Sequence, residues 1–260
     1  MKRVLPALAA FALTTSLLVL PALSLPQHGD EKMHIWKAGY YGSLLARLNT
    51  SAEMRDEYTD PGWSPRAFWG FDQPFGSAWL YALVLGATGT NPPSQPYSYS
   101  DRALQGPETA IPQATLPAVR LAAVLLAAIG LSLIAYRFGW PALVATVIFL
   151  AIPSVRDDLC RGWAEGPLLF GFGLAALSYG TRWFAATCGI AATFKLTALG
   201  LWPLAFWHGF GKGRYSHILG LAVATATWTA LEPPSWFAGG SSYLLSTCKL
   251  QTLHHRGCQW

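Results

Sequence analysis

The sequence predicts an all-α polytopic membrane protein, and three observations lead to this fold class. Only 12% of the 260 residues are charged, whereas a soluble domain carries roughly 25%. A further 52% are hydrophobic, and they are gathered into long segments without charge. This composition excludes a disordered chain and argues against a soluble globular enzyme, so we expect several transmembrane helices.

The first transmembrane helix is expected within residues 1–25. Val4 to Leu25 contains no charged residue and follows Met1-Lys2-Arg3, and a spanning helix needs about 20 apolar residues. A signal peptide is the alternative, since Ala22-Leu23-Ser24 is a tolerable cleavage site. The apolar segment is longer than the roughly 7–15 residues usual in a signal peptide, so we predict an uncleaved span.

Residues 26–116 are predicted to form a long outer loop with two juxtamembrane helices. The first, at about 33–48, places Ile35, Leu44 and Leu48 at a spacing that suits a helix lying along the membrane interface. The second, at 77–90, is apolar but too short to span a bilayer.

Residues 117–231 are predicted to form the transmembrane bundle, and 232–260 an outer C-terminal segment. The candidate spans are 117–136, 138–155, 167–179, 183–210 and 217–231. Segment 183–210 has two interpretations: a hairpin of two short legs with Lys195 at its outer turn, or one tilted span. An unpaired Lys is costly inside a membrane, so we prefer the hairpin. A single span would instead reverse the last segment.

The charged residues are sorted between the two predicted faces. All 13 acidic residues fall on the outer side or at an outer helix end. The charged residues of the predicted inner side are all basic: Lys2, Arg3, Arg137, Arg182, Lys212 and Arg214. This bias follows the positive-inside rule and explains the net charge of +5 without a nucleic-acid partner. We infer a polar working surface outside the membrane.

Candidate chemical groups lie on that outer surface. Asp30 and Glu31 follow the first span and Asp72 precedes the short helix, so they can supply a general base and a second charged or metal-binding group. Arg161 and Glu165 lie in the second outer turn. The alternative is that these acids are solvated loop residues, helix caps or partners in local salt bridges.

The C-terminal segment adds His254-His255-Arg256, which either binds a metal or a phosphate or is ordinary surface. The four cysteines show no CxxC spacing, so neither a metal cluster nor a disulfide framework is predicted. The sequence has no GxxxxGK[ST], GxSxG, HExxH or GxGxxG motif. A P-loop pump, a serine hydrolase, a zincin and a Rossmann enzyme are therefore disfavoured.

The order of motifs resembles GT-C membrane glycosyltransferases of the dolichyl-phosphate-mannose protein mannosyltransferase and aminoarabinose transferase group. The first outer loop carries the resemblance through Asp30-Glu31, Tyr40-Tyr41, Asp60-Pro61-Gly62-Trp63 and Phe71-Asp72-Gln73-Pro74-Phe75-Gly76. Later similarities are Arg120-Leu121, the turn from Arg161 to Glu165, and Gly189-Ile190-Ala191-Ala192-Thr193-Phe194-Lys195. Gln73 and Phe75 depart from the residues usual in this group.

This resemblance implies transfer of a sugar from a polyprenyl-phosphate donor to a hydroxyl of a lipid, glycan or protein acceptor. It implies that Asp30, with Glu31 beside it, is the catalytic base. Asp72 matches the family's second acid, which either orients the acceptor or holds a divalent metal with His254 or His255.

The implied substrate-binding residues are Glu165, Arg161, Lys195, Arg256, Tyr40 and Tyr41. The cations among them would stabilise the leaving phosphate. The expected location is the bacterial inner (plasma) membrane, as a multi-pass integral protein with its active face outside.

Two other functions stay open. Proteins of this group normally continue beyond the position of Trp260. The first alternative is therefore a truncated or catalytically inactive membrane subunit that acts in binding or assembly. A transporter is the third interpretation, but it calls for internal repeats, which the sequence does not show.

Overall fold

The computed structural model of the protein describes residues 2–28, 31, 34, 35, 38, 76–89 and 114–210. In this part of the chain every element is helical, as the sequence predicts. The elements are α1 (Val4–Ser24), α5 (Gly76–Thr88), α6 (Thr115–Phe138), α7 (Trp140–Ala151), α8 (Pro153–Cys160), α9 (Glu165–Ser178), α10 (Phe184–Phe194), the 3₁₀ helix η3 (Leu196–Leu201) and α11 (Trp202–Phe210). By length and composition, α1 and α6 are able to cross a membrane.

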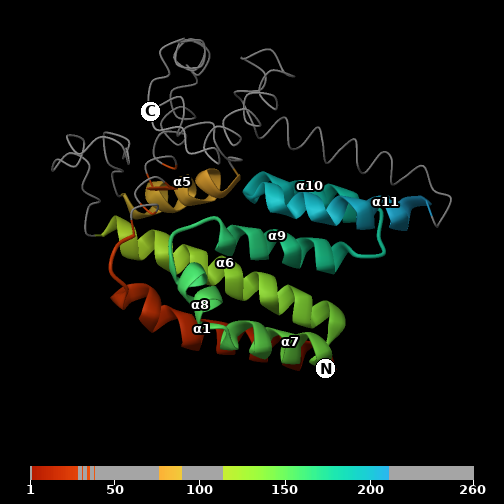
Figure 1. Ribbon diagram of the computed structural model, residues 1–260, viewed down its shortest axis with the longest axis horizontal. Helices are drawn as coiled ribbons and strands as arrows, with labels where there is room; N and C mark the ends of the chain where they lie inside the picture. Colours follow the sequence, from red (N-terminus) through yellow and green to blue (C-terminus); the bar gives the residue numbers. More distant parts are fainter. Residues whose placement is uncertain are drawn as a thin grey trace, which may run out of the picture.

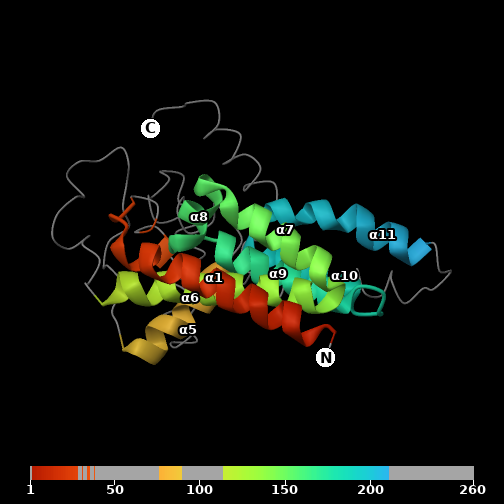
Figure 2. The ribbon, with the colours of Figure 1, turned by 90° about the horizontal axis from the view of Figure 1, so that it is seen from below.

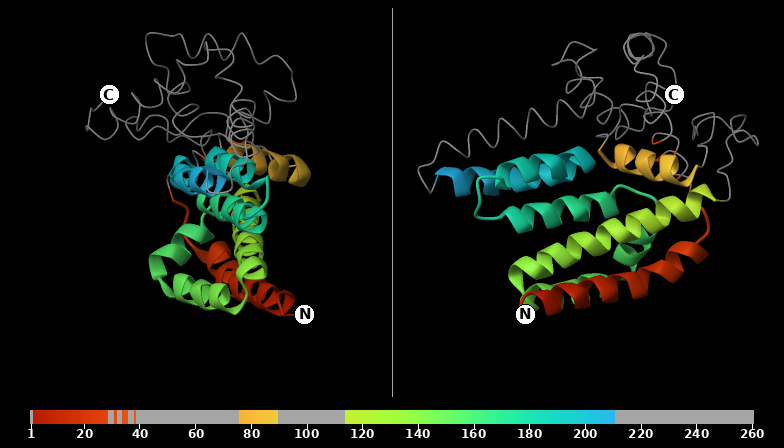
Figure 3. Two further views of the ribbon diagram at one scale, coloured as in Figure 1. Left: turned by 90° about the vertical axis from the view of Figure 1, so that its right-hand side faces the viewer. Right: turned by 180° about the vertical axis from the view of Figure 1, so that it is seen from behind.

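Helix α6 is the centre of the bundle. It packs against α1 on one side and α9 on the other, and α10 covers the far side of α9 (Figure 1). The same succession of α1, α6, α9 and α10 is visible from behind (Figure 3). Short helices α7 and α8 lie against α1 and α6, and α6 also contacts α5, so α1, α5, α7, α8 and α9 all pack against α6.

Small residues bring α6 and α9 into backbone contact. A Cβ added to Gly130 would lie 2.2 Å from the carbonyl oxygen of Leu169, and one added to Gly173 would lie 2.6 Å from that of Gly130. Two turns nearer the start of α9 than Gly173, a Cβ on Gly166 would meet the carbonyl oxygen of Ala123 at 2.3 Å. Such close approach of helices requires small side chains and is typical of transmembrane packing.

The predicted span at 138–155 is interrupted, which corrects the sequence analysis. Helix α7 ends at Ala151, and Ile152 adopts an extended conformation with φ −76° and ψ 117°. The cause is Pro153, since a proline restricts the residue before it to extended backbone. Pro153 then opens α8, where its missing N–H costs nothing.

The chain reverses at Lys195, as the hairpin interpretation predicts. Lys195 separates α10 from η3 with extended backbone, φ −156° and ψ 136°. Beyond it, Ala205 of α11 is buried in one cluster with Phe184 and Cys188 of α10. Helix α11 therefore returns alongside α10, and the view from below shows the two legs next to each other (Figure 2).

The described charges are sorted between the two ends of the bundle. One end, where α1 and α10 finish and α6 and α9 begin, carries all the acidic residues of the described part; we call it the ionic end. Its acids are Glu31, Asp157, Asp158 and Glu165. The opposite, basic end carries Lys2, Arg3, Arg137 and Arg182. The predicted span at 217–231, the segment at 232–260 and the inner residues Lys212 and Arg214 lie outside the described residues.

The α6–α9 contact makes a prediction about stability. Gly130→Ala should lower the thermal unfolding temperature of the detergent-solubilised protein, because the new methyl group overlaps a backbone carbonyl of α9; overpacking of this kind costs about 1–3 kcal/mol.

Gly86→Ala is the matched control, since nothing lies within 4 Å of a Cβ at this position in α5. It should leave the unfolding temperature equal or raise it, because alanine favours the helix. Equal unfolding temperatures for the two variants would contradict the described packing of α6 on α9.

Candidate functional site

A buried ion pair joins the segment after α1 to the start of α6. The side chain of Arg120 is 2% exposed and that of Glu31 is fully buried. Arg120 donates from Nε to Oε1 of Glu31 and from Nη2 to Oε2, each at 2.7 Å. This two-point arrangement fixes the orientation of both groups, which a single hydrogen bond does not.

The carboxylate of Glu31 also receives two backbone hydrogen bonds. The N–H of Gly162 donates to Oε1 at 3.1 Å, and the N–H of His28 donates to Oε2 at 2.8 Å. Glu31 therefore ties together the segment after α1, the start of α6 and the turn between α8 and α9. Each of its oxygens accepts two hydrogen bonds.

Arg120 uses its other donors on the end of α1. Its Nη1 donates to the carbonyl oxygens of Ala22 at 3.0 Å and Leu25 at 2.7 Å, and its Nη2 donates to that of Pro26 at 3.0 Å. The last carbonyls of a helix have no partner within the helix. A guanidinium at this position satisfies them and interacts favourably with the negative end of the helix dipole.

The surroundings of Glu31 keep it ionised. Burial raises the pKa of its carboxyl group, but the hydrogen bonds from Arg120, His28 and Gly162 outweigh burial, and the net pKa lies below the ordinary value of 4.5. A carboxylate held in this way is a weak proton acceptor at neutral pH. The geometry of Glu31 suits holding the segment after α1 in place better than accepting a proton from a substrate.

Arg161 lies beside this pair. Its Nη2 contacts Oδ2 of Asp157 at 3.1 Å, and its Nη1 lies 3.9 Å from Oε2 of Glu31. The guanidinium carbon also lies 5.5 Å from the ring centroid of Trp163. Arg161 is 11% exposed, so this cation is held by an acid on each side and by an aromatic face.

Helix α5 is attached to the same end of the bundle. The hydroxyl of Tyr81 donates to the backbone carbonyl of Trp163, and the side chain of Tyr81 is fully buried. The indole ring of Trp163 meets the imidazole of His28 edge to face, with 5.2 Å between centroids. The α8–α9 turn thus contacts both the segment after α1 and helix α5.

Lys195 and Glu165 form a further ion pair of the ionic end. Nζ of Lys195 donates to Oε1 of Glu165, in the first turn of α9, and both side chains are partly exposed. The pKa of Asp158 lies above its ordinary value, because burial and the nearby charges of Glu165 and Asp157 raise it more than Lys195 and Arg161 lower it. The break after α10 therefore brings an accessible cation to a group of acids.

The structure brings together four of the residues that the sequence predicts for the site: Glu31, Arg161, Glu165 and Lys195. The others lie outside the described residues: Asp30, Asp72, Tyr40, Tyr41, Arg256, His254 and His255. Within the described ranges, no group of three or more His, Cys, Asp or Glu side chains could hold a metal ion. The metal and its two His ligands stay a prediction.

Sequence reasoning missed the role of Arg120, which the structure places at the centre of this end. The signal was present: a charged residue inside an apolar span is costly unless it has a partner.

Comparisons with known protein families, curated proteins and solved structures find no match for this chain.

The buried pair makes a prediction about stability. Glu31→Gln should destabilise the folded protein by about 3–5 kcal/mol in thermal unfolding, because the guanidinium of Arg120 would stay buried without a counter-charge. Asp157→Asn is the control, since it removes a carboxylate that is 43% exposed and also pairs with an arginine. This pair, which is open to solvent on the Asp157 side, contributes about 0–1 kcal/mol. Equal losses in the two variants would contradict the central position of Glu31.

The lowered pKa of Glu31 makes a prediction about pH. A carboxyl group whose pKa is lower in the folded state stabilises that state above its unfolded pKa, near 4.5, and this contribution is lost as the pH falls through the folded pKa. The unfolding temperature of the unmodified protein should exceed that of Glu31→Gln most at neutral pH. The difference should shrink below about pH 4.5, and a difference that grows on acidification would contradict the ion pair.

Proposed function

We propose that this chain is a multi-pass membrane glycosyltransferase that moves a sugar from a polyprenyl-phosphate donor to an acceptor hydroxyl at the outer face. The observation that carries the proposal is the ionic end of the bundle. There Arg120 fixes Glu31, the residue that follows Asp30 in the sequence, and Arg161 and Lys195 supply positive charge.

Several features support a membrane as the surroundings of the bundle. Helices α1 and α6 have the length and composition of membrane spans. Large apolar side chains face outward, such as Leu20 at 73% exposure on α1 and Ile148 at 62% on α7. Such surfaces suit contact with lipid. The sorting of the charges to the two ends supports an orientation with the ionic end outside.

In the proposed reaction Asp30 is the general base. It takes the proton of the acceptor hydroxyl as the oxygen attacks the anomeric carbon of the sugar. The new bond between carbon and the acceptor oxygen forms while the bond between that carbon and the phosphate oxygen breaks, and the polyprenyl phosphate leaves with the electron pair. Glu31, whose oxygens are engaged by Arg120 and backbone N–H groups, acts as a positioning residue.

The departing phosphate needs positive charge, because stabilisation of developing negative charge is commonly the largest catalytic contribution. Lys195 and Arg161 are the cations of the ionic end that we assign to it. Lys195 is 35% exposed and is held by Glu165 at the break after α10. Glu165 is therefore proposed to keep the ammonium group directed at this end until donor binds.

One observation favours the alternative function of an inactive membrane subunit used in binding or assembly. Six charges of the ionic end are paired within the protein: Glu31 with Arg120, Arg161 with Asp157 and Lys195 with Glu165. A subunit without catalytic activity would need these pairs only for its own stability.

Substitution of the proposed base tests the function. Asp30→Asn should lower the rate of sugar transfer from a polyprenyl-phosphate donor by about 10²–10⁴-fold in proteoliposomes, the range that general-base catalysis supplies. The protein should insert into the membrane normally. Gly86→Ala, at a position of α5 where an added Cβ meets nothing within 4 Å and to which we assign no chemical role, should transfer at close to the unmodified rate. Equal rates for Asp30→Asn and the unmodified protein would rule out this mechanism.

A further inference from the structure

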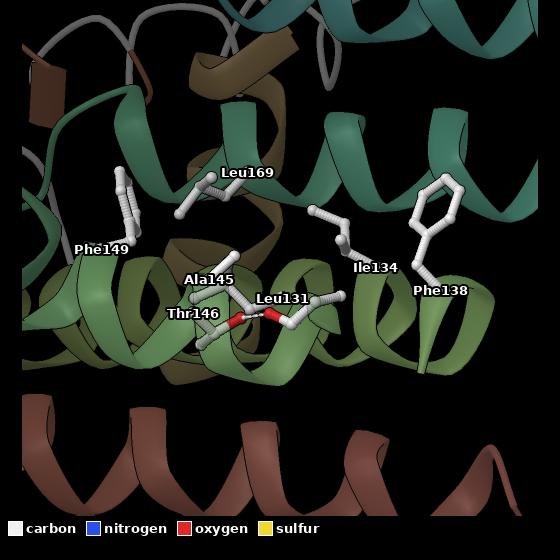
Figure 4. A pocket seen from close by; sticks show the side chains of 8 residues that line it. Leu131, Ile134, Phe138, Ala145, Thr146, Phe149 and Leu169 are labelled. Carbon is white, nitrogen blue, oxygen red and sulfur yellow. Dashed lines mark hydrogen bonds between the residues drawn. The ribbon is translucent and has the colours of Figure 1, made fainter. Parts of the chain in front are cut away.

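An open apolar groove of about 490 Å³ runs along α6 between α7 and α9. Its walls include Ile134 and Phe138 of α6, Ala145 and Phe149 of α7 and Leu169 of α9 (Figure 4). Thr146 is the polar side chain of this lining, and its hydroxyl donates to the carbonyl of Ala142 in its own helix at 2.9 Å. The groove therefore offers apolar contact and has a volume within the range of small-molecule sites, about 300–1,000 Å³.

A cation lies at the end of the groove that Phe138 forms. Arg137 donates from Nη2 to the carbonyl oxygen of Tyr179 at 3.1 Å. Its guanidinium carbon lies 5.7 Å from the ring centroid of Phe138 and 6.0 Å from that of Tyr179. These contacts hold the guanidinium where α6 meets the end of α9, directly beside the apolar surface.

The surroundings of Arg137 are positive. Lys2, Arg3 and Arg182 share the basic end with it, and in the described ranges no carboxylate forms an ion pair with any of the four. A guanidinium has five N–H donors, and the bond to Tyr179 uses one of them. Arg137 therefore has donors left for an anion that approaches the end of the groove.

We propose that this groove and Arg137 form a binding site for an anionic phospholipid. An acyl chain lies along α6 between α7 and α9, and the lipid phosphate accepts hydrogen bonds from Arg137. The inference rests on the proposed membrane embedding but not on sugar transfer. Basic pockets between transmembrane helices on the cytoplasmic side bind anionic headgroups, and arginine pairs with phosphate at two points. A zwitterionic headgroup would add a cation to an end that is already positive.

Native mass spectrometry of the full chain in detergent tests the headgroup part of the site. The probes are phosphatidylglycerol and phosphatidylcholine with identical acyl chains. Phosphatidylglycerol should bind in preference, and Arg137→Gln should weaken it by about tenfold, the value of one charge-assisted hydrogen bond. Arg182→Gln is the charge-matched control, because Arg182 does not line the groove and lies over Trp183 with 5.2 Å to the ring centroid; it should weaken binding much less than Arg137→Gln does.

A second pair of variants tests whether the acyl chain of the lipid lies in the groove, and it leaves Arg137 unchanged. Ala145→Phe places a ring in the groove and should reduce the binding of phosphatidylglycerol. Val144→Phe, at an exposed neighbour that does not line the groove, should leave binding intact.

Four results would overturn the site: equal affinity for the two lipids, equal losses in Arg137→Gln and Arg182→Gln, equal losses in Ala145→Phe and Val144→Phe, or a dimer in place of a lipid adduct. Lipid binding without sugar transfer would refute the proposed function alone.

Discussion

The ion pair between Glu31 and Arg120 is the interaction on which the rest of the ionic end depends. A charge taken into an apolar bundle is tolerated only with a partner and with its remaining hydrogen bonds satisfied. Arg120 meets this condition through Glu31 and the carbonyls at the end of α1, and Glu31 meets it through two backbone N–H groups. The last turn of α1, the start of α6 and the turn before α9 are consequently held in one relative position.

The two ends of the bundle differ in how their charges are used. At the ionic end, acids and bases pair across helices, and these pairs bring Arg161 near the chain that follows α1 and hold Lys195 at the start of α9. At the basic end, Arg137 contacts a backbone carbonyl and two aromatic rings, which leave its charge uncompensated within the described residues. Helices α6 and α9, which are in close contact at Gly130 and Gly173, run between the two ends. The chemistry proposed for the ionic end and the lipid contact proposed for the basic end thus belong to one packed unit.

Much of this fold could be predicted from local pattern, and the failures have physical reasons. The reversal at Lys195 was predictable because an ammonium group inside an apolar segment needs a turn or a partner, and it has both. The interruption at Ile152 was missed because the apolar pattern continues through Pro153, although the backbone does not. The partner of Glu31 could not be assigned, since Arg120 lies far along the chain and only tertiary packing joins them. Asp30, Asp72 and the His pair lie outside the described residues.

The most direct test of the account is the steady-state rate of sugar transfer by Arg120→Lys beside the unmodified protein, both in proteoliposomes with a polyprenyl-phosphate sugar donor. Lysine keeps the positive charge but loses the planar fork that binds Glu31 at two points. If Glu31 and Arg120 position the catalytic loop, the unmodified protein transfers sugar and Arg120→Lys loses kcat while its KM for the donor changes little. Absence of transfer by the folded, unmodified protein, or an unchanged kcat in Arg120→Lys, would contradict the account.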